Sequence, residues 1–302
     1  VVLGHATSIY SPGGWYNHWH IVSGISNLNA FIYSYHMPLF FFISGYLLYK
    51  TAQNSPNWLN YNKKRFKRLI IPYYIAGLIY FLPAFWLIHP IPQQITTTVK
   101  NYLTLADGGY LWFLITLFCT SLIFTTILKT PLKDKSWLLF SIFIILNLLS
   151  SKLNVADLYF KRVLHNLIYF YFGFYLAQNN RLQKIITKPL AILLIFSCSY
   201  ISFRYHFQPL TAMGFIAAFY GLSVYLCQTK EQLFNNRFIK FIASNMILLY
   251  IIHEPIMIGM LKSWNYGATM NPYLGAFLLF ILDLLLTINI VYLYRLITDK
   301  KK

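Results

Sequence analysis

The sequence predicts an all-α fold: a polytopic membrane helix bundle of about ten transmembrane helices. Of its 302 residues, 58% are hydrophobic and only 11% are charged, whereas a soluble domain carries about 25% charged residues. The apolar residues also gather into continuous runs, and a membrane-spanning helix needs about 20 mostly apolar residues. The strands of a membrane barrel would instead alternate apolar and polar residues.

Ten apolar runs, separated by polar segments, are the predicted spans. In chain order they cover 1–10, 31–49, 69–88, 110–128, 136–150, 164–178, 189–204, 210–227, 246–262 and 273–296. The first run has no Met and no charged start, so it is not interpreted as a signal peptide. It resembles the outer end of a helix whose beginning is missing, and we expect the first helix to be truncated. No internal repeat or soluble appendage is visible, which predicts a single membrane-embedded domain over 1–302.

The distribution of basic residues predicts the orientation. Lys and Arg number 25 against 7 Asp and Glu, a net charge of +18. In the ten-span arrangement, 19 basic residues fall in one set of alternate loops and 6 in the other. Because cytoplasmic loops are enriched in Lys and Arg, the richer set is predicted to be cytoplasmic, with both termini inside a cell membrane. The basic residues form no continuous face, which argues against a nucleic acid partner.

Two further groups of residues have structural explanations. Cys119, Cys198 and Cys227 lie in apolar runs without a C-x-x-C pattern, so we expect small buried side chains and no disulfide framework. The aromatic segment 15–20, which includes His18 and His20, suits either an interfacial belt or a stacking surface for sugar rings. The belt is the favoured interpretation.

Two histidines in the first two runs are candidate catalytic residues. His5 and His36 lie in consecutive, antiparallel predicted helices at similar depth, so both imidazoles could face one cavity. Imidazole is well suited to take a proton from a hydroxyl near neutral pH. The alternative for each is a structural hydrogen bond to a neighbouring helix.

Arg65 and Arg68 belong to the densest basic stretch, which enters the third run. Residues three apart share a helix face, where two guanidinium groups could hold a phosphate or pyrophosphate. The competing interpretation is an anchor that contacts anionic lipid headgroups.

His253 and Glu254 lie within the ninth run and are followed by Pro255. Ionisable side chains inside a membrane are candidates for function, and a proline can open the helix and leave a polar cavity. A helix kink with a satisfied histidine is the structural alternative. Asp283, in the last run, is a further intramembrane carboxylate whose partner the sequence does not identify.

Five blocks together resemble the integral membrane acyltransferases of acyltransferase family 3, in particular the branch described as fucose 4-O-acetylase-like. The run from His36 to Tyr46, which contains Ser44, is similar to the family's second-helix signature. The other four blocks are Val2 to His5, Arg65 to Arg68 with Pro72, Gly109 to Leu114 with Trp112, and Ser244 to His253. Their order and spacing agree with the family across most of the chain.

Two departures accompany the resemblance. The family usually carries an Arg eleven residues before the first-helix His, whereas this sequence begins four residues before His5. The resemblance therefore also predicts an incomplete first helix, which bears on activity. Some relatives append a soluble domain that hands the acyl group onward, and none is visible here, so the membrane part would complete the transfer itself.

The resemblance implies an O-acyltransferase that moves an acyl group, usually acetyl, from acyl-coenzyme A to a carbohydrate hydroxyl of a cell-surface or lipid-linked glycan. His5 or His36 would be the base and the other would orient the acceptor. Arg65, Arg68 and Trp112 would bind acyl-coenzyme A, while Ser44, His253 and Glu254 would line the acceptor site or be structural. Acetyl-coenzyme A would be a cosubstrate, with no bound cofactor or metal. The lipid bilayer is the surrounding partner.

Two other functions are compatible with the residues. Ten spans with an intramembrane His and Glu would suit a proton-coupled transporter or exporter of polysaccharide or glycolipid precursors. Against this, the two halves show no matched pair of helices broken by glycine. A non-catalytic membrane anchor or sensor is the third hypothesis.

Overall fold

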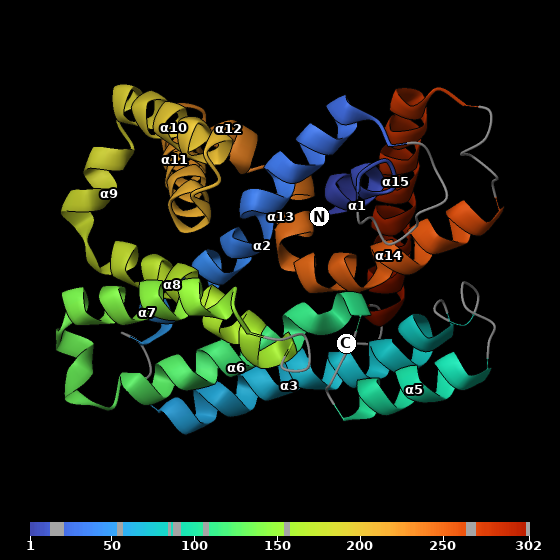
Figure 1. Cartoon of the computed structure of the whole chain (residues 1–302), viewed down its shortest axis with the longest axis horizontal. Coiled ribbons are helices and arrows are strands. Elements are labelled where there is room, and N and C mark those ends of the chain that lie inside the picture. The colour runs from blue at the N-terminus through green and yellow to red at the C-terminus, as the bar shows by residue number, and fades with distance from the viewer. Residues whose placement is uncertain are drawn as a thin grey trace. The chain divides into compact units, whose positions relative to one another are not determined.

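The computed structural model describes residues 1–12, 21–52, 57–83, 86, 92–104, 109–153, 158–263 and 270–299, and within these ranges every regular element is a helix (Figure 1). In chain order the elements are α1 (Val2–Ser8), α2 (Ser23–Ala52), α3 (Trp58–Ala76), the π-helix η1 (Gly77–Phe81), α5 (Pro92–Leu103), the 3-10 turn η2 (Gly109–Leu111), α6 (Trp112–Ile127), the 3-10 turn η3 (Pro131–Asp134), α7 (Ser136–Ser150), α8 (Leu158–Gln178), α9 (Asn180–Ile186), α10 (Pro189–Arg204), α11 (Gln208–Thr229), α12 (Glu231–Phe234), α13 (Arg237–Ser244), α14 (Met246–Ser263) and α15 (Pro272–Asp299). The all-α prediction is confirmed for these residues.

Membrane-spanning character is confirmed for part of the predicted set. Within the described residues, five helices are long and apolar enough to cross a bilayer: Ser23–Thr51, Gly109–Ile127, Gln208–Thr229, Met246–Ser263 and Pro272–Thr298. The bent pair of α9 and α10 raises this number to six if it counts as one span, and α7 is a shorter apolar helix. In the part of the chain that the structure describes, each of the ten predicted runs overlaps a helix, but ten transmembrane crossings are not confirmed.

The chain divides into two compact units. The first unit comprises Val1–Tyr33, Leu78–Ile95 and Lys230–Lys302. In it, α1 packs against both α14 and α15. The core of this packing consists of apolar side chains, namely Ala6, Ile9, Tyr10, Ile25, Met257, Leu261, Ala276 and Leu279. A short helix from the start of the chain is thereby held by two long helices from its end.

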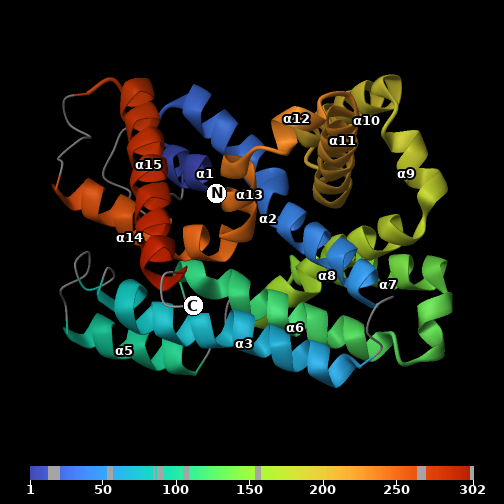
Figure 2. The same cartoon turned by 180° about the vertical axis from the view of Figure 1, so that it is seen from behind.

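The second unit comprises Ser34–Gly77 and Thr96–Thr229. Its α6 packs against α3 and α8, α7 packs against α8, and α10 pairs with α11; α10 and α11 lie side by side in both views (Figures 1 and 2). A Cβ atom added to Gly45 of α2 would collide with the carbonyl oxygen of Phe170, and one added to Gly173 of α8 with that of Phe42. The two helices therefore cross in backbone contact, the close approach that small residues allow in membrane bundles.

The change from α3 to the π-helix η1 has a local cause. The Tyr102 hydroxyl donates to the carbonyl oxygens of Tyr73 and Tyr74, at 2.9 Å and 2.7 Å. A Cβ atom at Gly77, where η1 begins, would collide with the Tyr102 ring. A side chain that inserts into the helical hydrogen-bond ladder is an established cause of helix irregularity, so Tyr102 accounts for the break.

The structure corrects the expectation for the cysteines. All three are free, but Cys198 and Cys227 are exposed and Cys119 is partly buried. Within a helix that faces lipid, an exposed apolar position satisfies the hydrophobic pattern as well as a buried one does, because lipid and protein core are both nonpolar.

Candidate active site

His5 lies on α1, and the neighbouring helix α2 fixes the backbone around it. The Asn29 side-chain amide donates to the Gly4 carbonyl oxygen at 2.8 Å and to the Thr7 hydroxyl oxygen at 3.0 Å. The Ser8 hydroxyl donates to the His5 carbonyl oxygen at 2.8 Å. These bonds lock the seven-residue helix α1 on both sides of His5, although a helix of this length is marginal by itself.

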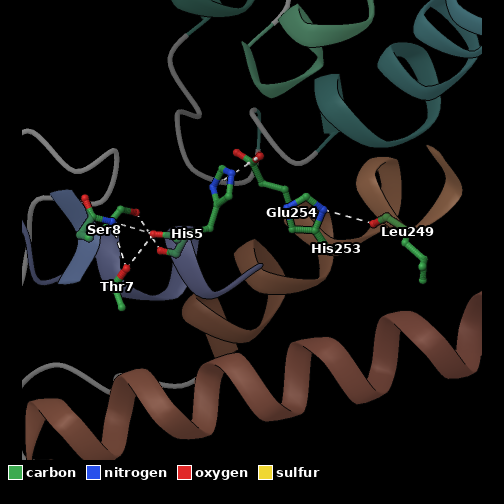
Figure 3. Close-up of polar contacts among 8 residues, drawn as sticks. His5, Thr7, Ser8, Leu249, His253 and Glu254 are labelled. Carbon is green, nitrogen blue, oxygen red and sulfur yellow. Dashed lines mark hydrogen bonds and ion pairs between the residues drawn. The ribbon is translucent and has the colours of Figure 1, made fainter. Parts of the chain in front are cut away.

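The imidazole of His5 faces a carboxylate of α14 (Figure 3). Its Nδ1 lies 3.8 Å from Oε2 of Glu254, and the two side chains are 16% and 10% exposed. This distance exceeds a hydrogen bond but lies within the range of an ion pair once His5 is protonated. The His253 ring stands edge-on to His5, with 5.3 Å between centroids. Polar groups from the two ends of the chain thus meet in one place. His5 comes from α1, while His253 and Glu254 are adjacent residues of α14.

The hydrogen bond of His253 defines its tautomer. Nδ1 lies 3.2 Å from the Leu249 carbonyl oxygen (Figure 3). Because a carbonyl oxygen only accepts, Nδ1 carries the proton and Nε2 bears a lone pair. Among the described residues, Nε2 is buried without a hydrogen-bond partner. His253 therefore presents an acceptor for a hydroxyl or another donor.

The structure gives Asp283 a hydrogen-bond partner that the sequence could not supply. Its Oδ1 accepts a hydrogen bond from the Thr287 hydroxyl at 3.2 Å, and Glu254 is close enough for the two carboxyl groups to repel each other if both are charged. Asp283 is fully buried. Two carboxyl groups and two imidazoles thus gather within the first unit, far more polarity than packing alone requires.

Among the described residues, His5, His253 and Glu254 are grouped closely enough to be candidate ligands of a metal ion. One ligand atom each of His5, His253 and Glu254 lies within 4.8 Å of the others. His and carboxylate donors at this spacing suit a divalent metal ion such as zinc. The same groups also suit proton transfer and hydrogen bonding.

Arg65 and Arg68 lie on α3 in the second unit. The Arg65 guanidinium donates from Nη1 to the Tyr61 hydroxyl at 3.1 Å, while its Nε is buried without a hydrogen-bond partner among the described residues. Burial lowers the pKa of the Arg65 guanidinium from its ordinary value. Arg68 is exposed. A half-buried Arg held by a Tyr, next to an exposed Arg, is a more organised arrangement than a surface anchor requires.

Trp112 begins α6, and the side chain above it comes from α8. The guanidinium carbon of Arg162 lies 4.6 Å from the centre of the Trp112 ring, a cation-π contact. On the same helix, Phe118 meets Phe66 of α3, and Trp112 lies six residues, or about 9 Å, beyond that contact. Trp112 therefore lies some way along α6 from the point where α3 carries Phe66 and its neighbour Arg65.

The family model described as an acyltransferase domain matches residues 1–295. The chain belongs to acyltransferase family 3. Comparison of this acyltransferase with curated proteins and with solved structures gives no match. The family prediction is confirmed, while the fucose 4-O-acetylase-like branch is not.

The remaining predicted residues of the acyltransferase lie on α2. His36 is buried and Ser44 partly buried, and both belong to the second unit. Because His5 belongs to the first unit, the pairing of His5 with His36 stays a prediction. The aromatic segment 15–20 lies outside the described residues.

Sequence reasoning missed Asn29, Arg162 and Arg295 of this acyltransferase. The contacts of Asn29 and Arg162 are described above. In the late block, the Asn245 side-chain oxygen accepts from Nε of Arg295 at 2.6 Å, which ties the junction of α13 and α14 to α15. The available signal for Arg295 was a charged residue on a largely apolar helix.

Proposed function

We propose that this acyltransferase moves an acyl group, with acetyl as the expected one, from acyl-coenzyme A to a hydroxyl of a cell-surface or lipid-linked glycan. Family membership supports acyl transfer. The observation that carries the mechanism is the close pair of His5, which is partly buried, and Glu254, which is buried, with 3.8 Å between Nδ1 and Oε2. A base inside an apolar bundle suits a reaction in which water would waste the thioester.

In the proposed mechanism His5 is the general base. Its Nε2, the ring nitrogen away from Glu254, takes the proton of the acceptor hydroxyl while the hydroxyl oxygen attacks the thioester carbonyl carbon. Glu254 stabilises the imidazolium that forms. As the carbon–sulfur bond breaks, the proton passes to the departing thiolate, and the products are the ester and coenzyme A. His253 Nε2 accepts a hydrogen bond from the acceptor sugar.

The donor site and the topology are part of the same proposal. Arg65 and Arg68 hold the phosphates of coenzyme A, and Trp112 contacts its far end; the unpartnered buried Nε of Arg65 supports this assignment. The chain crosses a cell membrane ten times, with both termini in the cytoplasm. Residues 1–302 form one domain, and the family match across both units supports this single domain. The fucose 4-O-acetylase-like branch remains the proposed subgroup.

The experiment uses the purified protein in nanodiscs with acetyl-coenzyme A, and measures thiol release and the acetyl content of glycans by mass spectrometry. His5→Ala should lower transfer by about 10²–10⁴-fold, the usual contribution of a positioned base, with an unchanged thermal midpoint. His206→Asn is the matched control, since His206 is exposed and its φ of 60° suits Asn. Turnover that survives both His5→Ala and His36→Ala would refute the mechanism.

The transporter hypothesis receives no support from the family match. An acyltransferase domain explains residues 1–295, and the polar cluster around His5 needs no transported ion. Glycan flux across vesicles that contain the protein but no acyl donor would reopen it.

A further inference from the structure

An apolar groove runs between α10 and α11 in the second unit. Its volume is about 310 Å³. Apart from the hydroxyl of one tyrosine, the lining side chains are apolar: Pro189, Ile192, Leu193, Phe196, Ala218, Phe219, Leu222 and Tyr225. On the same helix, Leu190, Leu193 and Leu194 are each more than half exposed, so this face of α10 has the character of a surface in contact with lipid.

The short helix α9 turns sharply at one end of this groove. The axes of α9 and α10 are bent by 81° at the break between them. The Gln183 side chain accepts from the Tyr220 hydroxyl at 3.0 Å and donates to the Leu176 carbonyl oxygen at 2.8 Å. Ile186 is buried, and its carbonyl oxygen would collide with a Cβ atom on Gly221. Helix α9 is therefore held firmly against α11 in this bent position.

The outer face of α9 and the corner that follows it are basic. Arg181, Lys184 and Lys188 are exposed, and Lys188 directly precedes Pro189, which lines the groove. The sequence from 158 to 229 contains no Asp or Glu. Helix α9 and the corner that joins it to α10 thus carry three positive charges, and the sequence from α8 to α11 supplies no negative charge to neutralise them.

We infer that this groove and α9 form a binding site for one anionic phospholipid molecule. The phosphate binds Lys184 and Lys188, and one acyl chain lies between α10 and α11. If α10 crosses the bilayer, an 81° bend places α9 near the membrane surface, where lipid phosphates lie and where basic residues attract anionic headgroups. Charge complementarity at the end of an otherwise apolar groove favours such a lipid over an apolar protein segment.

The test measures lipid retention by native mass spectrometry after reconstitution of the full chain in nanodiscs of equal phosphatidylglycerol and phosphatidylcholine. We expect phosphatidylglycerol to be retained in preference, and the double variant Lys184→Gln with Lys188→Gln to reduce its retention by about tenfold or more, since each basic residue near the surface strengthens binding several-fold. The matched control is Lys133→Gln with Lys135→Gln, which removes two exposed charges elsewhere in the unit and should change nothing. Leu222→Trp fills the groove from a partly exposed position and should lower retention without unfolding the protein.

Equal retention of the two lipids, or an equal loss in the control variant, would overturn the inference. Displacement of phosphatidylglycerol by palmitoyl-coenzyme A alone would assign the groove to the donor's acyl chain. A dimer mass that Leu222→Trp abolishes would assign it to a second copy of the chain. Because the readout is lipid retention, the result is independent of whether acyl transfer is observed.

Discussion

At the scale of single residues, the position of His5 next to Glu254 has a chemical consequence. A carboxylate in a nonpolar surrounding interacts strongly with a nearby imidazolium, because little water screens the two charges. Glu254→Gln keeps the shape of the side chain and removes its charge. We expect this variant to lose most of its acyl-transfer rate, by at least about tenfold, while Glu254→Asp regains part of it.

The measurement is the transfer rate at saturating acetyl-coenzyme A. Glu231→Gln is the control, because Glu231 is an exposed carboxylate of the same unit and should not affect the rate. Full activity in Glu254→Gln would show that the carboxylate only supports the fold.

Asn29 provides a second prediction. Its amide is the donor in both bonds to α1, at 2.8 Å and 3.0 Å. Asn29→Ala leaves the Gly4 carbonyl oxygen without this donor, and we expect a loss of about 1–3 kcal/mol in unfolding free energy together with a lower transfer rate. Asn29→Asp should be at least as harmful, because a carboxylate cannot donate to a carbonyl oxygen.

Thermal unfolding and the transfer rate would both be measured. Asn289→Ala is the matched control, since the exposed Asn289 amide also donates to a backbone carbonyl, that of Leu285, at 2.8 Å. Equal effects of the two alanine variants would contradict a special role for Asn29.

The sequence identified several of these residues but not how they are paired. A histidine or a glutamate in an apolar run is conspicuous by itself, so His5, His253 and Glu254 could be predicted as candidates. Which side chains meet depends on the packing of α1 against α14, and no local pattern encodes a contact between the two ends of a chain. The predicted partner of His5 was His36, whereas the contacts described are with Glu254 and His253.

At the scale of elements, the close crossing of α2 and α8 predicts that a glycine-to-alanine change destabilises the protein at the crossing but not elsewhere. Gly45→Ala and Gly173→Ala each place a Cβ atom against a backbone oxygen that cannot move away. We expect each to cost about 1–3 kcal/mol, the usual effect of overpacking. Gly259→Ala in α14 meets nothing within 4 Å and should be neutral or stabilising by about 0.5–1 kcal/mol, because Ala favours helix.

Unfolding midpoints in detergent would distinguish these outcomes. Three variants with the same shift would mean that helix propensity, and not the close crossing, controls stability at these positions.

The helices themselves were largely predictable, while their breaks were not. Continuous apolar runs predicted the ten segments because lipid and protein core both select nonpolar side chains. The π-helix η1 depends on Tyr102 of α5. The bend before α10 depends on contacts that Gln183 and Ile186 make with Tyr220 and Gly221 of α11. Such breaks leave no periodic signal in their own segment.

At the scale of the whole molecule, the predicted orientation can be tested by labelling. In a background with the three native cysteines replaced by Ser, a membrane-impermeant maleimide should reach Lys133→Cys and Lys184→Cys only from the cytoplasmic side. Lys152→Cys should react only from the opposite side. All three positions are exposed, so each should be reactive when the reagent has access.

Intact and inverted vesicles provide the two sides. If Lys133→Cys and Lys184→Cys label from different sides, the number of crossings between them is odd, and the ten-span arrangement is wrong.

The short helices of the second unit have a consequence for the bilayer itself. Helices α7 and α10 have 15 and 16 residues, lengths of about 22 Å and 24 Å, against a hydrocarbon thickness of about 30 Å. If both cross, the surrounding lipid must become thinner beside them, at a modest cost for each ångström of mismatch. The protein should therefore have a higher thermal midpoint in bilayers of 14-carbon lipids than in those of 18-carbon lipids. The reverse order would indicate that neither helix crosses alone, and membrane thickness would then have no part in where this enzyme resides.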